Sequence, residues 1–252
     1  MSAPTPQDQA KMAAGRKAVE VYARDGLRLG LGSGTTSHFF VRALAVQVEQ
    51  GLDIVGVPTS TATRDLAREL GVPLADLDDV PQLDVVIDGP DEIDHDGSMI
   101  KGGGACLLWE KIVARASTTM VVVADDSKLV QTLGRFPLPI EIVRFGQVST
   151  TRLVRDLLGD FGYADVELTP RLTGSERLVT DSGNYIVDAH LQQVHRPAEL
   201  TVELNRIPGV VENGLFVGIA HEVVFGHPDQ TADVYPLPLP SDLSITKEPT
   251  QA

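Results

Sequence analysis

The chain has 252 residues but only one cysteine, Cys106, so no disulfide can form within it. This excludes the small secreted domains that depend on disulfides for stability. The chain also lacks any run of 18 apolar residues, so no segment resembles a membrane-spanning helix. Residues 1–9 are polar and lack the apolar stretch of a signal peptide, so we expect a cytoplasmic location.

Positive charge is scarce. The chain has 21 Lys and Arg against 35 Asp and Glu, which gives a net charge of −14. An acidic surface repels nucleic acid phosphates and anionic lipid head groups, so we expect neither nucleic acid nor a membrane as a partner. An anionic small molecule would need a local positive site that overcomes the overall field.

The N-terminal half alternates short apolar runs with stretches of helical spacing. Unbroken apolar runs are typical of parallel strands buried on both faces of a sheet. The pattern predicts an α/β domain with a doubly wound, mostly parallel, Rossmann-like sheet over residues 10–134. The expected strands are 27–31, 53–57, 83–87 and 120–124, and the expected helices are 11–24, 35–50, 61–70 and 105–117.

Residues 135–207 have a different pattern. Their β-α-β-β-α-β order predicts a smaller ferredoxin-like α+β domain, inserted into the first domain. Residues 208–232 are then expected to complete the catalytic α/β domain, and residues 1–9 and 237–252 to form flexible tails. The expected strands are 139–145, 166–172, 178–189 and 210–219, and the expected helices are 150–161 and 197–205.

A glycine-rich loop follows the first strand and opens a helix. It reads Gly32-Ser33-Gly34-Thr35-Thr36. Free N–H groups and the helix dipole at such a position favour an anion, so the loop is a candidate phosphate site. The alternative is a tight strand-to-helix turn. The loop lacks the Gly-Lys-Ser/Thr of a Walker A motif and the third glycine of a dinucleotide fingerprint.

Acids cluster where the strand at 83–87 ends. The segment reads Asp88-Gly89-Pro90-Asp91-Glu92-Ile93-Asp94. Ligands of open α/β sheets bind beyond the carboxyl ends of the strands, so these acids are placed for proton transfer. A solvated acidic turn and a magnesium or calcium site are the alternatives, although the spacing does not match an EF-hand loop.

A lysine, three glycines and a glutamate come next. The segment 101–104 reads Lys-Gly-Gly-Gly, and Glu110 follows in the predicted helix. Lys101 can stabilise a developing negative oxygen. We expect Leu107, Leu108 and Trp109 to keep water away from Glu110 and to raise its pKa, as a general base requires. The alternative for Glu110 is an acid on a helix surface.

Together with Asp125-Asp126-Ser127-Lys128, these motifs resemble ribose-5-phosphate isomerase type A in order and spacing. The later stretches 136–141, 180–184 and 207–211 agree, and the resemblance covers roughly residues 11–230. It implies interconversion of ribose 5-phosphate and ribulose 5-phosphate through an enediolate, in the non-oxidative pentose phosphate pathway. It also implies that there is no cofactor and no metal, and that the chain forms a homodimer or homotetramer.

The resemblance also implies a role for each matched residue. Glu110 matches the general base, Asp88 and Asp91 match the two active-site aspartates, and residues 101–104 match the substrate loop. For the mechanism, we expect Lys101 to stabilise the enediolate and Asp88, assisted by Asp91, to open the sugar ring. The matched substrate-binding residues are Ser33, Gly34, Thr35, Thr36, Asp88, Gly89, Pro90, Asp91, Lys101, Gly102, Gly103, Gly104 and Lys128. Lys11 would add a phosphate contact if the N-terminal alignment, which needs a one-residue gap, holds.

The chain departs from the family pattern at three positions. Pro90 stands where alanine is usual, Trp109 stands where arginine is usual, and Cys106 replaces a small residue. No departure removes a matched catalytic group. We expect Cys106 to be a packed residue rather than a nucleophile, because no basic partner is evident.

Two other classes of protein share features of this pattern. A sugar-phosphate-sensing module of a transcription regulator would keep the phosphate loop but would need a DNA-binding domain. A related enzyme, such as an amino-sugar phosphate deaminase or a coenzyme A transferase, would need a ring-opening histidine or a covalent glutamate. Product analysis with ribose 5-phosphate separates these alternatives.

Overall fold

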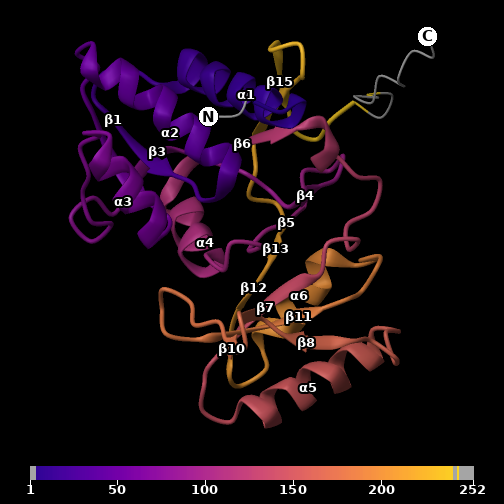
Figure 1. Cartoon of the computed structure of the whole chain (residues 1–252). Coiled ribbons are helices and arrows are strands. Elements are labelled where there is room, and N and C mark those ends of the chain that lie inside the picture. The colour runs from indigo at the N-terminus through magenta and orange to yellow at the C-terminus, as the bar shows by residue number, and fades with distance from the viewer. Residues whose placement is uncertain (1–3, 241–242, 244–252) are drawn as a thin grey trace.

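Six strands form the sheet of the larger module, in the order β15-β14-β6-β3-β1-β2 (Figure 1). The computed structural model describes residues 4–240 and residue 243. Neighbouring strands of this sheet are parallel, except that the edge strand β15 is antiparallel to β14. The doubly wound, mostly parallel sheet expected from the sequence is therefore confirmed. The strands are β1 (Leu27–Leu31), β2 (Ile54–Pro58), β3 (Leu83–Asp88), β6 (Ser117–Asp125), β14 (Glu222–Gly226) and β15 (Ala232–Pro236).

Helices cover both faces of this sheet, which explains why the central strand β6 has an unbroken run of buried apolar residues at 120–124. On β6, Val121 and Val123 pack in a core cluster with residues of the helices on one face. Met120 and Val122, which alternate with them, pack in a second cluster with Val113 on the other face. The first face carries α1 (Pro6–Tyr22), α2 (Gly34–Glu49) and α3 (Thr61–Glu69), and the second carries α4 (Leu107–Ala116).

The first helix begins at Pro6, five residues before the start expected from the sequence. Thr5 caps it: the Asp8 N–H donates to the Thr5 hydroxyl and the Thr5 N–H donates to the Asp8 carboxylate, each at 3.1 Å. This capping box, with proline in the first turn, fixes the helix start. The expectation of a flexible tail over 1–9 is therefore wrong for residues 6–9.

Residues 237–240 also lie against the larger module. The Leu239 side chain is buried, and its N–H donates to the His95 carbonyl at 2.7 Å. The Leu237 N–H donates to the His221 carbonyl at 2.9 Å. A flexible tail is therefore wrong here too, and the rest of both expected tails, residues 1–3, 241–242 and 244–252, lies outside the described residues.

The smaller module has a four-stranded antiparallel sheet in the order β12-β7-β11-β8. This order, with two helices, is the ferredoxin-like arrangement that the sequence predicts. The second and third expected strands are shorter than expected, because turns occupy part of each. The elements are β7 (Leu138–Ile142), α5 (Gln147–Asp160), β8 (Leu168–Pro170), β9 (Leu172–Thr173), β10 (Glu176–Arg177), β11 (Tyr185–Ala189), α6 (Pro197–Asn205) and β12 (Val210–Asn213).

The chain returns to the larger module later than residue 208. β12 pairs with β7 and so belongs to the smaller sheet, because its Val210 and Asn213 continue the antiparallel register there. The next strand, β13 (Leu215–Phe216), pairs with β5 (Met99–Ile100), which pairs in turn with β4 (Glu92–Ile93). Figure 1 shows β5 and β13 at the junction of the two modules. Among the described residues, no helix combines the length and the apolar character needed to cross a bilayer.

Candidate active site

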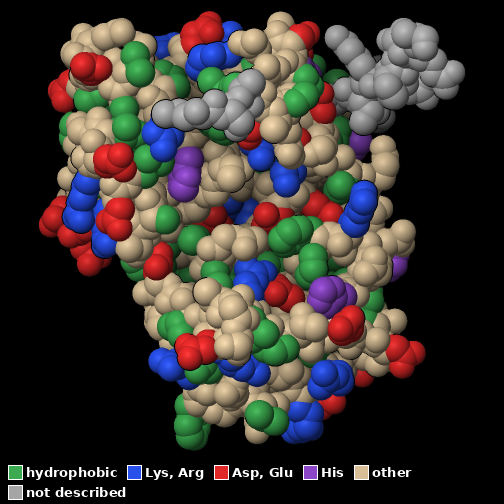
Figure 2. All heavy atoms as spheres, in the orientation of Figure 1, with side chains coloured by type: hydrophobic (Ala, Val, Ile, Leu, Met, Phe, Trp, Pro, Cys, Tyr) green, Lys and Arg blue, Asp and Glu red, His purple; other side chains and the backbone are tan. Residues whose placement is uncertain are grey.

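The predicted site residues meet at the carboxyl ends of β1 and β3, which are neighbours in the sheet. This is where open α/β sheets bind their ligands. All of the predicted residues except Asp88 and Lys101 line one pocket. Its lining is Ser33, Gly34, Thr35, Thr36, Gly89, Pro90, Asp91, Gly102, Gly103, Gly104, Glu110 and Lys128. Figure 2 shows acidic and basic side chains together at the level where the two modules meet.

The glycine-rich loop ends in the first turn of α2. Ser33 is the N-cap residue, and Gly34, at φ 85°, begins the helix. The first N–H groups of a helix have no partner within it, so residues 34–36 can donate to an anion. A cation stands beside them, because the Lys11 ammonium of α1 donates to the Thr35 hydroxyl at 3.0 Å. The structure thus brings Lys11 to the loop despite its distance in sequence.

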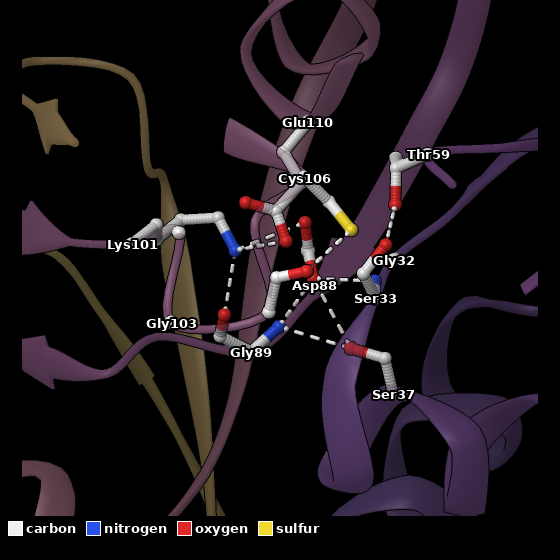
Figure 3. A network of polar contacts seen from close by, with 12 residues as sticks. Gly32, Ser33, Ser37, Thr59, Asp88, Gly89, Lys101, Gly103, Cys106 and Glu110 are labelled. Atoms are coloured by element: carbon white, nitrogen blue, oxygen red, sulfur yellow. Dashed lines mark hydrogen bonds and ion pairs between the residues drawn. The ribbon is translucent and has the colours of Figure 1, made fainter. Parts of the chain in front are cut away.

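Asp88 lies beneath the pocket and is 1% exposed. Its Oδ1 accepts hydrogen bonds from the Ser33 N–H at 3.0 Å, the Gly89 N–H at 2.8 Å and the Ser37 hydroxyl at 3.1 Å (Figure 3). A Cβ at position 32 would lie 2.3 Å from the same oxygen, so the close approach of β1 to Asp88 requires glycine there.

Lys101 joins the two carboxylates. Its ammonium lies 3.0 Å from Asp88 Oδ2 and 3.3 Å from Glu110 Oε1, and it donates to the Gly89 carbonyl at 2.6 Å (Figure 3). Lys101 is 1% exposed and Glu110 is 5% exposed. The second oxygen of Glu110, Oε2, is buried and has no hydrogen-bond partner among the described residues. A substrate proton could therefore be taken up there.

Burial sets the protonation of this cluster. It raises the pKa of the Glu110 carboxyl; Lys101 opposes the rise and Asp88 adds to it. For Lys101, burial alone would lower the pKa, but Asp88 and Glu110 together outweigh it and the pKa is raised. Lys101 therefore keeps its charge, while Glu110 holds a proton to a higher pH than an exposed glutamate does.

Asp91 is held by the glycine loop. The Gly103 N–H donates to Asp91 Oδ2 at 2.7 Å, and a Cβ at position 103 would lie 2.5 Å from Asp91 Oδ1. Burial raises the pKa of Asp91, while the Gly103 N–H and Lys101 oppose the rise. Unlike Asp88, Asp91 lines the pocket directly, as does Lys128 at the end of the 3-10 turn η1 (Asp126–Lys128).

The other acids near β3 do not join this site. Asp84 accepts from the Arg28 N–H at 2.7 Å, and Asp94 accepts from the Ser98 N–H at 2.8 Å. Glu92 accepts from two backbone N–H groups, those of Gly134 and Phe136. In the described part of the chain, no three His, Cys, Asp or Glu side chains gather as metal ligands do. Each of these acids instead holds a loop or strand.

Trp109 does not cover Glu110. Its indole N–H donates to the Ser182 hydroxyl of the smaller module at 2.9 Å, and Leu108 lines a separate groove. The expectation that these two side chains shield Glu110 is therefore wrong, because successive helix positions point in different directions. Leu107 is buried as expected, and Cys106 is partly buried with a thiol pKa raised by burial to about 12, as fits a packed residue.

Sequence reasoning missed three residues at the site. Ser37 binds Asp88, and its spacing of one helical turn from Ser33 was an available signal. Thr59, directly after β2, forms a hydrogen bond with the Ser33 hydroxyl at 2.6 Å. Arg171 reaches the glycine loop from the smaller module, donating to the Gly102 and Gly103 carbonyls. No local motif marks Thr59 or Arg171, since only the tertiary fold brings them there.

Comparison with known proteins agrees with this geometry. The sequence model of the family described as ribose 5-phosphate isomerase A (phosphoriboisomerase A) matches residues 55–230. A curated ribose-5-phosphate isomerase A 2 of Yersinia pseudotuberculosis is 49% identical over 229 residues, covering 90% of this chain and 97% of the relative. A ribose-5-phosphate isomerase A of Jannaschia is 49% identical over 231 residues, covering 91% of this chain and 88% of the relative.

Solved structures give the same result. Ribose 5-phosphate isomerase of Plasmodium falciparum superposes with a TM-score of 0.86 at 32% identity, over 91% of this chain and 98% of its own. A D-ribose-5-phosphate isomerase described as a complex with phospho-erythronic acid superposes with a TM-score of 0.82 at 35% identity, over 90% and 97% of the two chains.

Proposed function

Because this chain belongs to the ribose 5-phosphate isomerase A family, we propose that it interconverts D-ribose 5-phosphate and D-ribulose 5-phosphate through an enediolate, with Glu110 as the base. One observation carries the assignment. Glu110 Oε2 is buried without a hydrogen-bond partner among the described residues, while Oε1 pairs with Lys101. A free carboxylate oxygen beside a buried cation suits removal of a proton from carbon. The reaction belongs to the non-oxidative pentose phosphate pathway.

The proton moves between C1 and C2 of the open-chain sugar. Glu110 takes the C2 proton of ribose 5-phosphate and returns it to C1, and the reverse reaction runs the other way. Negative charge develops on the oxygens of the enediolate. The Lys101 ammonium lies behind the pocket lining, beside Glu110, and stabilises that charge electrostatically, because the low dielectric makes the interaction strong. Lys101 acts without proton transfer, because its pKa is raised.

Ring opening is best assigned to Asp91. The sequence reading gave this step to Asp88 with the help of Asp91, but Asp88 is 1% exposed and its Oδ1 already accepts three hydrogen bonds. Asp91 lines the pocket and has a raised pKa, so it can exchange a proton with the sugar hydroxyls. Asp88 then serves to hold the Lys101 ammonium in place.

The phosphate binds at the start of α2. The N–H groups of residues 34–36 and the hydroxyls of Thr35 and Thr36 surround its oxygens, and the Lys11 ammonium supplies charge beside Thr35. This local site overcomes the net charge of −14. Binding energy from the phosphate fixes the position of C1 and C2, which lie at the other end of the substrate.

Isomerisation in deuterated water tests this function. Purified protein is mixed with ribose 5-phosphate and followed by NMR. We expect ribulose 5-phosphate to form and to gain solvent deuterium at C1, because the Glu110 proton exchanges with water during turnover. Phospho-erythronic acid should compete with the substrate, since its carboxylate resembles the two enediolate oxygens. Absence of ribulose 5-phosphate would refute the function. Release of ammonia from an amino-sugar phosphate would favour the deaminase, and acyl-transfer products would favour the coenzyme A transferase.

The chain is also proposed to act in the cytoplasm as a homodimer or homotetramer. The phosphorylated substrate does not cross membranes unaided, which supports an internal location. A groove between α4 and α6 carries the exposed side chains Ile112 and Val202, a surface that a second copy could cover. Light scattering on the purified chain measures the number of copies.

A further inference from the structure

Arg171, between β8 and β9, reaches out of the smaller module to the glycine loop of the larger one. Its Nη1 donates to the Gly102 carbonyl at 2.5 Å and to the Gly103 carbonyl at 3.1 Å. No sequence motif suggests this contact, and the mechanism above does not use it. It is nevertheless a direct link from the smaller module to the pocket wall.

This contact reaches Asp91 through one peptide group. The Gly102 carbonyl and the Gly103 N–H belong to the same planar peptide, and in a trans peptide they point in opposite directions. The carbonyl accepts from Arg171, and the N–H donates to Asp91 Oδ2 at 2.7 Å. The peptide therefore lies between a guanidinium and a carboxylate, which together fix its orientation.

Arg171 is itself held firmly. Its Nε donates to Asp188 Oδ2 at 2.9 Å, and its Nη2 pairs with the other carboxylate oxygen of Asp188, on β11. Both side chains are 14% exposed. A bidentate pair of this kind locks the plane of the guanidinium, so that Nη1 points at the loop. Lysine could not form the same pair and also reach two carbonyls.

We propose that Arg171 is a positioning residue for the isomerisation, which orients Asp91 and the glycine loop through the peptide between Gly102 and Gly103. The proposal rests on the function proposed above. It gives the smaller module a part in the reaction, because the side chain that follows its strand β8 sets the geometry of the pocket wall. The phosphate subsite at residues 33–36 lines the same pocket through a different loop, at the start of α2, so we expect it not to depend on Arg171.

The test compares Arg171→Lys and Arg171→Ala with the wild type and with Arg152→Gln. Arg152 pairs with Asp156 on the surface of α5, where the two side chains are 66% and 57% exposed. Arg152→Gln therefore also removes an arginine–aspartate pair, but far from the pocket. Circular dichroism first establishes a temperature at which all variants are folded. We expect kcat to fall about 10- to 100-fold in both Arg171 variants, as a misplaced reacting group does. KM should stay within about threefold, and Arg152→Gln should behave as the wild type.

Chemical rescue separates positioning from a general structural role. Millimolar guanidinium chloride should restore at least several-fold of the kcat lost in Arg171→Ala, and the same concentration of sodium chloride should not. Folded Arg171 variants with kcat within twofold of the wild type would overturn the proposal, as would a loss that guanidinium does not relieve. If Arg171→Ala does not fold, the kcat of Arg171→Lys decides. A wild type with no activity on ribose 5-phosphate would refute the proposed function instead.

Discussion

The Lys101 ammonium lies 3.3 Å from Glu110 Oε1, and both side chains are almost fully buried. The proposed base and the proposed stabiliser of the intermediate are therefore one electrostatic unit, which Asp88 completes from the other side at 3.0 Å. In such a unit, the charge of each member depends on the others. A substitution at one of the three positions therefore changes how readily the other two groups bind a proton.

Glu110→Gln should abolish the reaction while leaving binding largely intact. The amide keeps the shape of the side chain but cannot take a proton from carbon, so we expect kcat to fall at least about 100-fold, within the range for loss of a general base. Calorimetry with phospho-erythronic acid measures binding. Glu20→Gln, at an exposed pair with Lys17, is the control and should keep wild-type turnover. Near-normal turnover in Glu110→Gln would contradict the assignment.

The rate should fall on the acidic side at a higher pH than an ordinary glutamate would give. Burial raises the pKa of Glu110, and the base works only when deprotonated, so kcat falls as the pH drops through this raised pKa. kcat should be measured rather than kcat/KM, because the free substrate phosphate titrates near pH 6. A kcat that stays level down to about pH 5 would show that burial does not control this carboxyl.

Lys101→Met should destabilise the fold. It leaves Asp88 and Glu110 buried without their cation, and breaking a buried pair from one side costs about 3–5 kcal/mol. The loss in the free energy of unfolding should shrink at acidic pH, because the two carboxylates can then take up protons. Urea unfolding at several pH values measures this. Lys17→Met, at an exposed pair, should cost less than about 1 kcal/mol. An equal cost for both variants would argue against a buried charge cluster.

Gly103→Ala should reduce turnover by displacing Asp91. The new Cβ would lie 2.5 Å from Asp91 Oδ1, closer than any real contact, so the carboxylate or the loop must move. We expect kcat to fall about 10- to 100-fold. The control is Gly159→Ala in α5, where a Cβ meets nothing within 4 Å and alanine favours the helix. That variant should keep full activity, and full activity of Gly103→Ala as well would show that Asp91 tolerates displacement.

Local patterns were enough to predict most of the fold. The mostly apolar run at 83–87 predicted β3, and Pro197 at a helix start predicted α6, because both signals act over a few residues. The early start of α1 was missed, although Thr5 and Asp8 form a readable capping box. The boundary at residue 208 was placed too early for a different reason: β12 pairs with β7, a partner that the tertiary fold chooses and that the sequence of β12 does not reveal.

The residues of the candidate site likewise fall into those that local motifs predicted and those that only tertiary packing brings together. The glycine loops and Glu110 stand in local motifs, so the sequence pointed to them, and the structure places them around one pocket. The depth of Asp88 beneath that pocket and the turn of Trp109 toward Ser182 depend on how separate segments pack. Arg171 is the extreme case, since its partners lie in the other module. A sequence pattern indicates which chemical groups a segment carries, but not which other segments those groups contact.

The order of the strands also bears on how the chain is made. β14 lies next to β6 in the large sheet, with Val224 opposite Val123, and the whole smaller module is synthesised between them. α1 rests so closely on β14 that a Cβ at Gly226 would lie 2.0 Å from the Ala10 carbonyl. On the ribosome, the side of α1 that faces β14 and the edge of β6 that pairs with β14 therefore stay uncovered until almost the last strand emerges. The smaller module has all its strands by then and can fold first, so late closure of the large sheet is the step most open to aggregation.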